Sequence, residues 1–468
     1  MPLKIYNFIS KKIEEFKPNS QTVGLYTCGP TVYDYVHIGN WRTFIFEDIL
    51  KRVLEFNGYK VKHVMNITDI DDKIIIASRE QGIGIRELAQ KYEKVFFEDL
   101  DKLNILKADI YPRATDHISS IVQTIELLVD KGFAYKSDDG VYFAIDKFKN
   151  YGKLSNLSTR KIKVGARVAQ DQYDKDQPAD FALWKFTKGE EPSWDAPFGK
   201  GRPGWHIECS AMAQEYLGDP SADSTSSLQA SSGRNLERFR TIDIHTGGVD
   251  LLFPHHENEI AQSEAATGKK FVNFWLEGEH LLVERKKMAK SLGNIFTLSD
   301  VIKKGIDPLA LRYLFLTAHY RSKLNFTWKS LESAQNALEN FKFQISNFKL
   351  STKMSPSVDF LNKFRSAINN DLNMPVALGL VWYLLRSGMK DDVKLSTLLE
   401  VDKVLGLGLD KIEGAKLPKG AQELIDEREK LRAEGEFEES DKLRKDLQKM
   451  GVYVEDTPDG PKWKIKKR

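Results

Sequence analysis

The fold is decided by a stretch near the start of the chain, Val23-Gly-Leu-Tyr-Thr-Cys28-Gly-Pro30. Its apolar run predicts a buried strand that ends at Gly29-Pro30. Apolar residues at helical spacing predict a helix from Thr43 to Phe56, and Tyr59 to Ile67 predicts a second strand. Strand, helix and strand in this order form a βαβ unit of a parallel sheet. Ligands of such sheets bind beyond the carboxyl ends of the strands.

Beyond this unit, the composition and the hydrophobic pattern of the chain change several times. From about residue 116 to 204, loops rich in Gly, Lys, Asp and Trp predict an insertion with its own small fold. The run Ile242-Asp-Ile-His245 predicts that a strand of the first sheet then resumes. Between them, Ser221 to Arg240 contains six serines and predicts a mobile loop. Beyond about residue 300, spacings of three and four predict helices, ending in a pair over 423–431 and 437–450.

The composition is that of a globular protein. Hydrophobic residues make up 41% of the 468 residues and charged residues 29%, and the net charge is only +3. This argues against disorder and against a wholly basic nucleic-acid coat. The longest apolar stretch, Met374 to Leu385, is shorter than the ~18 residues of a membrane span, and we see no secretory signal. Two cysteines, Cys28 and Cys209, exclude a disulfide framework and predict a reducing cytoplasm.

Two motifs have the chemistry of a nucleotide site. The first, His37-Ile-Gly39-Asn40, opens a helix, whose start presents N–H groups and a positive dipole end to phosphate. There His37 would donate to a phosphate oxygen and Gly39 would let a ring approach the backbone. The second, Lys286-Lys-Met-Ala-Lys290-Ser-Leu-Gly-Asn294, contains a pair of lysines three residues apart that could clamp a triphosphate. The alternative for the first motif is a helix start without a ligand, and the alternative for the second is a solvated basic loop.

Two further strings add a possible ribose contact and a possible metal site. Thr246-Gly-Gly248-Val-Asp250 follows a predicted strand, so Asp250 could accept a ribose hydroxyl, although a plain turn is the alternative. Phe253-Pro-His-His-Glu-Asn-Glu259 predicts a helix start at its proline, with His255 and Glu259 on one face. With Cys28 and Cys209 they offer sulfur, nitrogen and oxygen donors suited to zinc. A metalloprotease motif is excluded, because Ile260 stands where its second histidine belongs.

Together these strings resemble the class I aminoacyl-tRNA synthetases. Asn40 replaces the last histidine of their H-I-G-H motif, and Ala289 replaces the first serine of K-M-S-K-S. Longer strings resemble one family of that class, the cysteinyl-tRNA synthetases, over nearly the whole chain. They are Leu25–Asp34, Asn66–Lys73, Gly204-Trp-His-Ile-Glu-Cys-Ser210, Phe253–Glu259 and Asp307–Tyr313. The serine-rich stretch is longer than is usual in that family.

The resemblance implies an α/β fold. We expect a Rossmann-like parallel-sheet catalytic domain over residues 1–115 and 205–265, with an inserted connective-peptide subdomain over 116–204. A stem-contact region with the K-M-A-K-S loop would span 266–320. A mostly α-helical C-terminal half would follow, with a helical bundle over 321–410 and an anticodon-binding domain over 411–468.

The resemblance also implies an activity, ATP-dependent ligation of L-cysteine to cysteine tRNA through a cysteinyl-adenylate. One zinc per chain, held by Cys28, Cys209, His255 and Glu259, would select the cysteine thiol. Serine is nearly the same shape, and a hydrophobic pocket separates near-isosteres by only about 10²-fold, whereas zinc prefers thiolate. Mg-ATP would be the second substrate. We expect a cytoplasmic monomer that does not associate with a membrane.

Individual roles follow from the same resemblance. His37, Lys287 and Lys290 would be catalytic, and Gly39, Asn40, Gly248 and Asp250 would join His37 and Lys290 in binding the nucleotide. Cys28, Thr68 and Trp205 would contact the amino acid, although core packing is an equal alternative for Thr68 and Trp205. Trp463, in a basic tail, would stack on an unpaired tRNA base. The alternative is a tail that only improves solubility.

Three other kinds of protein share parts of this pattern. A simple nucleotidyltransferase is typically short and has no helical C-terminal half. A cysteine ligase of thiol biosynthesis shares the catalytic half, but the run Val454-Glu-Asp-Thr-Pro-Asp-Gly-Pro-Lys-Trp463 resembles the end of a synthetase anticodon domain. A non-catalytic RNA-binding descendant would not need the lysines and the zinc donors that this chain retains.

Overall fold

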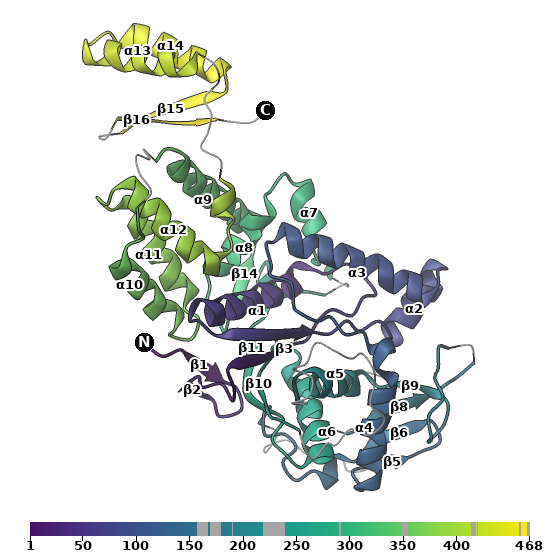
Figure 1. The fold of residues 1–468 in the computed structure, drawn as a ribbon. Coiled ribbons are helices and arrows are strands. Elements are labelled where there is room, and N and C mark those ends of the chain that lie inside the picture. The colour runs from purple at the N-terminus through teal and green to yellow at the C-terminus, as the bar shows by residue number, and fades with distance from the viewer. Residues whose placement is uncertain are drawn as a thin grey trace.

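The computed structural model describes most of the chain. The described residues are 1–156, 167–168, 179–189, 191–218, 239–289, 292–348, 354–412, 418, 420–457 and 460–465. Except for its last two residues, the serine-rich stretch Ser221–Arg240 lies outside them, so the expectation of a mobile loop there stays a prediction. Figure 1 shows a lower part built around a sheet, a helical part above it and a separate small unit at the C-terminus.

A four-stranded parallel sheet forms the centre of the lower part, in the order β11-β10-β3-β4. Helix α1 connects β3 to β4, which confirms the predicted βαβ unit, and β10 joins the same sheet beside β3. The strands are β3 (Thr22–Thr27), β4 (Lys60–Met65), β10 (Ile242–Gly248) and β11 (Val272–Gly278).

Both faces of this sheet are buried. Leu25 belongs to the core under α1, whereas its neighbour Tyr26 belongs to a second core that includes Cys209. Successive side chains of a strand point to opposite faces, so a sheet covered on both sides needs apolar residues at nearly every position. Helix α1 (Ile38–Phe56) packs directly on β4, β10 and β11, and α3 (Ile85–Lys102) shares its core. Helices α5 (Trp205–Ala213) and α6 (Glu257–Thr267) contribute to the second core, and α2 (Asp72–Gln81) packs against α3.

The inserted segment has its own sheet but shares its core. Phe143 and Leu183 pack in one cluster with Ile207 of α5 and Ala261 of α6. The segment therefore rests on the helices that cover the lower face of the central sheet (Figure 1). The order is β5-β6-β8-β7, with β9 on β8. The elements are η1 (Ala114–His117), α4 (Ile118–Asp130), β5 (Ala134–Lys136), β6 (Gly140–Phe143), η2 (Ile145–Lys147), β7 (Arg167–Val168), β8 (Asp180–Phe186) and β9 (Gly201–Pro203). Outside this segment, η4 (Gln214–Gly218) follows α5 and contacts β3 and β4 of the central sheet.

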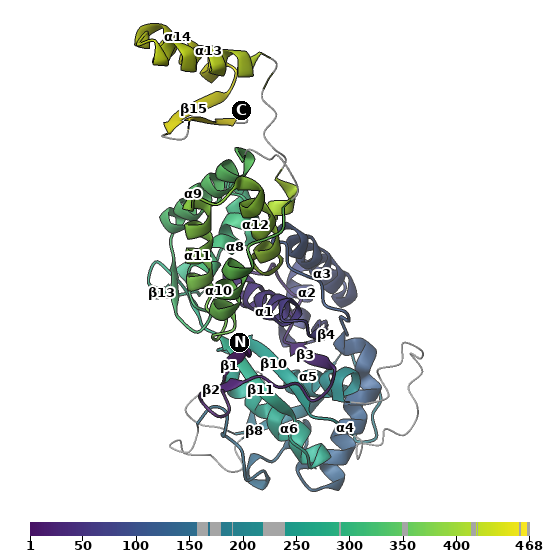
Figure 2. The ribbon, with the colours of Figure 1, turned by 60° about the vertical axis from the view of Figure 1, so that its left-hand side comes forward.

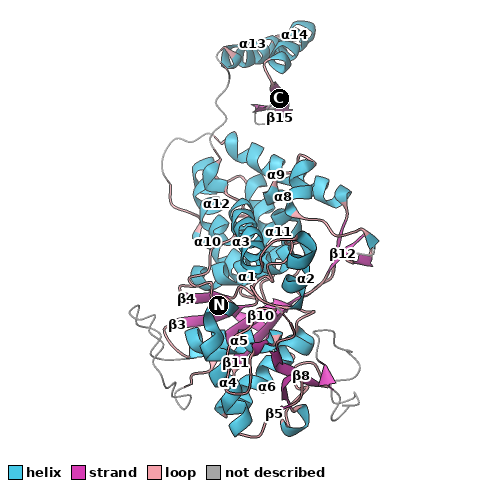
Figure 3. Cartoon of the chain, turned by 90° about the vertical axis from the view of Figure 1, so that its right-hand side faces the viewer, coloured by secondary structure: helices cyan, strands magenta, loops and turns pink. Residues whose placement is uncertain are grey.

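The helical prediction beyond residue 300 is confirmed, and Figure 3 shows the helices grouped above the sheet. The apolar stretch Met374–Leu385 is an amphipathic helix that exposes Val376 and Tyr383. No helix in the described ranges has the length and apolarity that a membrane span requires. The remaining helices and strands between residues 252 and 411 are η7 (Leu252–His256), β12 (Leu281–Val283), β13 (Lys286–Lys287), α7 (Leu298–Lys303), α8 (Pro308–Leu316), β14 (Leu324–Phe326), α9 (Trp328–Ser346), α10 (Val358–Ile368), α11 (Met374–Arg386), α12 (Asp391–Leu405) and η9 (Leu409–Lys411).

The two ends of the chain add small units. The N-terminal hairpin of β1 (Lys4–Asn7) and β2 (Lys12–Glu15) lies beside β11, where Phe8 N–H donates to the Trp275 carbonyl at 2.9 Å (Figure 2). The predicted C-terminal helical pair is confirmed as α13 (Ala421–Ala433) and α14 (Phe437–Lys449). It packs on the hairpin of β15 (Val452–Thr457) and β16 (Gly460–Ile465) around a core of its own. The domain boundaries given above stay proposals.

Candidate functional site

The two cysteines of the chain meet beyond the carboxyl end of the central sheet. Cys28 directly follows β3, Cys209 lies within α5, and His255 and Glu259 come from η7 and α6. One donor atom from each of the four lies within 4.8 Å of the others, and all four side chains are buried. The structure therefore brings together the whole predicted metal-binding set, from three segments far apart in sequence.

The segment with His255 and Glu259 differs from the expected helix. Phe253 is extended (φ −141°, ψ 127°), and the regular helix α6 begins at Glu257 rather than at Pro254. His255 nevertheless keeps its expected relation to Glu259, with 3.2 Å between Nε2 and Oε1. The two side chains meet because η7 continues directly into α6.

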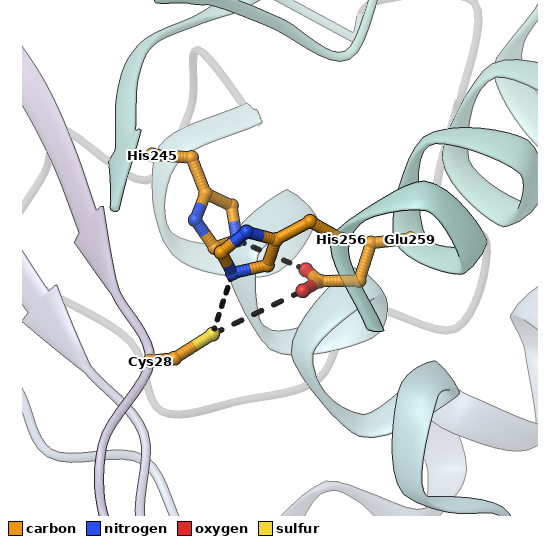
Figure 4. A group of neighbouring side chains, drawn as sticks. All are labelled: Cys28, His245, His256 and Glu259. Carbon is orange, nitrogen blue, oxygen red and sulfur yellow. Dashed lines mark hydrogen bonds and ion pairs between the residues drawn. The ribbon is translucent and has the colours of Figure 1, made fainter. Parts of the chain in front are cut away.

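A second donor set, Cys28, His245, His256 and Glu259, overlaps the first (Figure 4), and its member His245 was missed from the sequence. His256 Nε2 lies 3.5 Å from Cys28 Sγ, and His245 Nε2 lies 3.0 Å from Glu259 Oε2. His256 also pairs through Nδ1 with Glu277 Oε1 at 2.7 Å, which fixes the orientation of its ring. The available signal was His245 itself, a histidine at the carboxyl end of a predicted parallel strand.

Burial and neighbouring groups together set the protonation of this cluster. Burial, with Cys209 and Glu259 close by, raises the pKa of the Cys28 thiol well above its ordinary value. Burial lowers the pKa of His255 well below its ordinary value. Burial alone would raise the pKa of Glu259, but His245 and His255 hold it below its ordinary value. Neutral imidazole and anionic carboxylate are ready metal donors, and a divalent cation deprotonates a coordinating thiol. The donor set therefore fits zinc.

His37 caps the helix that the first motif opens. Its Nδ1 accepts the Asn40 N–H at 3.1 Å, so the neutral ring carries its proton on Nε2 and can donate there. Burial lowers its pKa, which favours this neutral form. The Ile38 N–H already donates to the Phe296 carbonyl at 2.8 Å. The helix start therefore offers fewer free N–H groups to a phosphate than its sequence suggests.

The second motif lies over the first. A Cβ atom on Gly39 would overlap the methyl group of Met288, the residue after Lys287. Lys287 is exposed in β13, whereas Lys290 lies outside the described residues, so its position is not tested. Asp250 is also exposed, and its charge acts on His37 against the effect of burial. The described parts of the predicted nucleotide motifs are therefore neighbours.

Thr68 and Trp205 lie next to the metal-binding candidates. The Thr68 hydroxyl donates to Glu208 Oε2 at 3.2 Å, one residue before Cys209, and the Trp205 ring lies 4.4 Å from the ring of His255. Glu208 is fully buried and was not anticipated. Trp463 lies in β16 opposite Val454, but its side chain is outside what the structure describes.

Comparison with known proteins agrees with this arrangement. Residues 15–336 match the family model of the class I (C) tRNA synthetase catalytic domain, and residues 415–463 match that of the cysteinyl-tRNA ligase anticodon binding domain. A methionyl-tRNA synthetase of Mycobacterium tuberculosis, solved with methionyl-adenylate, has a similar fold, with a TM-score of 0.61 at 15% identity over 84% of this chain and 93% of that one. The fold and the family model thus define a class I aminoacyl-tRNA synthetase.

Curated relatives narrow the class to one amino acid. The cysteine–tRNA ligase of Chlamydia pneumoniae is 43% identical over 99% of this chain and 98% of its own length. That of Brachyspira hyodysenteriae is 42% identical over 98% of this chain and 99% of its own. The chain belongs to the cysteine–tRNA ligase family, whose members attach cysteine to tRNA.

Proposed function

We propose that this ligase works through a cysteinyl-adenylate formed beyond the carboxyl end of the central sheet. The cysteine carboxylate would attack the α-phosphorus of ATP and release pyrophosphate, and the terminal adenosine hydroxyl of tRNA would then accept the cysteinyl group. His37 would donate from Nε2 to a phosphate oxygen, and Asp250 would accept a ribose hydroxyl. Lys290, supported by Lys287, would stabilise the charge that grows on pyrophosphate.

One observation supports this location above the others. Cys28 and His37 lie on the same connection between β3 and α1, so the metal-binding candidates adjoin the nucleotide motif. An amino acid whose side chain reached Cys28, Cys209, His255 and Glu259 could thus present its carboxylate toward the phosphates. Positioning of this kind supplies much of the rate of such reactions.

We further propose that these four residues hold one zinc ion. Two sulfur donors and a carboxylate kept anionic by neighbouring histidines support that assignment. A zinc ion there would bind thiolate far better than the hydroxyl of serine, which gives selectivity without an editing site. Thr68 and Trp205, beside the cluster, would frame the rest of the amino acid.

The proposal is tested by ATP–pyrophosphate exchange and by tRNA charging, with the same enzyme. We expect cysteine to support pyrophosphate exchange without tRNA and serine to support little exchange. Charging should require the tRNA that accepts cysteine. Exchange that needed tRNA would contradict free adenylate formation. Equal exchange with serine would contradict the selective metal.

The remaining assignments rest on the family. We propose Mg-ATP as the second substrate, cysteine tRNA as the partner read by the C-terminal unit, and Trp463 as a base-stacking residue. We propose a cytoplasmic monomer from the same resemblance, and the two free cysteines agree with a reducing compartment. The match of residues 415–463 to the anticodon model favours tRNA over the small-molecule acceptor of a thiol-biosynthesis ligase.

A further inference from the structure

Arg42 is a buried cation that donates hydrogen bonds to four backbone carbonyls and also feels the negative charge of Glu279. It lies on α1, two residues after Asn40, and only 5% of it is exposed. Its Nη1 donates to the carbonyls of Glu279 at 2.9 Å and His280 at 2.5 Å. Its Nη2 donates to the carbonyls of His319 at 3.4 Å and Ser322. A planar guanidinium can serve four such acceptors in fixed directions, which a lysine cannot.

The first pair of acceptors, the carbonyls of Glu279 and His280, comes directly after the end of β11. Gly278, the last residue of β11, stands opposite Gly248 of β10, and its carbonyl accepts the Val249 N–H at 2.8 Å. A Cβ on Gly278 would meet Thr43 and Phe46 of α1. Arg42 thus ties the helix of the phosphate motif to the strand end that holds the Gly248–Asp250 turn.

The second pair of acceptors belongs to the loop after α8, residues 319–322. The Tyr320 carbonyl accepts the Glu279 N–H at 2.8 Å, and the Tyr320 ring stacks on Phe46 at 4.5 Å. Asp371 holds the same loop from outside, because the Tyr320 hydroxyl and Arg321 Nε both donate to it at 2.8 Å. The loop is therefore fixed on both sides and provides a rigid support for the end of β11.

Burial lowers the pKa of Arg42 to about 10, although the Glu279 carboxylate acts in the opposite direction, so the side chain stays protonated at neutral pH. A charged donor bonds a carbonyl more strongly than a neutral one, and here it acts away from water. Because the acceptors belong to two separate segments, loss of the guanidinium would release both from α1 together.

We propose that Arg42 is a positioning residue that sets the width of the ATP site, by holding the start of α1 against the end of β11. Its location relative to ATP rests on the proposed nucleotide site. It would act on substrate only through His37, Gly248 and Asp250. A misplacement of about 1 Å between such groups typically lowers a rate by about 10²-fold.

The chain offers a matched control on the same helix. Arg52 is also buried, and it lies near the C-terminal end of α1, far from the nucleotide motif. It donates to Asp48 and to the carbonyls of Lys403 and Asn104. Arg52→Met should therefore lower the melting temperature without changing the affinity for ATP. Arg42→Lys keeps the charge and much of the packing, and Arg42→Met removes the donors.

The test is equilibrium dialysis of Mg-ATP, together with exchange kinetics normalised to active sites. We expect Arg42→Lys to weaken ATP binding and raise KM for ATP about tenfold, with KM for cysteine unchanged, and Arg42→Met to do more. Normal ATP affinity in both Arg42 variants would overturn the inference, as would an equal loss in Arg52→Met. Dialysis does not depend on turnover, so a wild type without exchange would refute the adenylate route while the ATP affinities still decided the role of Arg42.

Discussion

Arg312 Nη2 lies 2.5 Å from Asp48 Oδ2, and neither side chain is exposed. Asp48 lies on α1 and Arg312 on α8, so this pair joins the helix of the phosphate motif to the helical part of the protein. Arg52 Nε contacts the same carboxylate at 2.8 Å, and the Leu106 N–H donates to its other oxygen at 2.8 Å. Arg312 also donates to the Leu405 carbonyl at 2.6 Å.

We predict that Asp48→Asn lowers stability by about 3–5 kcal/mol, because it leaves two buried arginines without their anion. Urea unfolding followed by tryptophan fluorescence measures the loss. Asp359→Asn is the control, because Asp359 pairs with Lys363 on the surface and should change little. Equal unfolding midpoints for wild type and Asp48→Asn would contradict the assigned role.

The contribution of Asp48 should depend on pH in one direction. Burial alone would raise its pKa, but Arg312 and Arg52 bring it below the ordinary value. The unfolded carboxyl, with an ordinary pKa of about 3.9, then binds its proton at higher pH than the folded one. The stabilisation is therefore complete above about pH 4 and is lost as pH falls through the folded pKa. The difference in the free energy of unfolding between wild type and Asp48→Asn should become smaller only in that acidic range.

We predict about one zinc per chain in gently purified protein, measured by elemental analysis. Cobalt substitution distinguishes the two overlapping donor sets, because its thiolate charge-transfer absorption counts the bound sulfurs. With Cys28 and Cys209 as ligands, Cys209→Ser should lose about half of that absorption. His256→Asn should keep it. A spectrum unchanged in Cys209→Ser and altered in His256→Asn would assign the metal to the second set.

Lys290→Ala should lower cysteine-dependent exchange about 10²-fold with the fold intact, because it removes a cation from the leaving pyrophosphate. Lys287→Ala should have a smaller effect. Lys286→Ala, an exposed neighbour in β13, is the control and should behave as wild type. Normal exchange in Lys290→Ala would show that the loop takes no part in adenylate formation.

Removal of the residues after Lys411 should impair tRNA charging far more than exchange. The C-terminal unit has its own core of Ile425, Leu447 and Val452 among others, whereas the adenylate residues all lie upstream. Trp463→Ala should raise KM for tRNA, since stacking on a base is worth about 1–3 kcal/mol. Tyr383→Ala removes an exposed aromatic of α11 and is the control. Equal losses in charging and exchange would indicate a general role in stability.

Local patterns predicted the central βαβ unit well. Apolar runs and helical spacing depend on near neighbours, so β3, α1 and β4 could be read directly. Apolar spacing reports α1 only from Thr43 onward, and the start at Ile38 agrees with the expectation that the His37–Asn40 motif opens a helix. The His37 side chain caps this start by accepting the Asn40 N–H, a contact that only the structure shows. The C-terminal pair α13 and α14 was equally readable.

The sequence by itself determined the residue types of the site, because motifs such as His37–Asn40 and Phe253–Glu259 are continuous along the chain. Only the tertiary structure decided which of them meet. The contacts of His245 and His256 with Glu259 and Cys28, and the four carbonyls around Arg42, depend on how strands and loops distant in sequence pack. Such contacts are set by the burial of whole faces of the sheet, which no short stretch of sequence encodes.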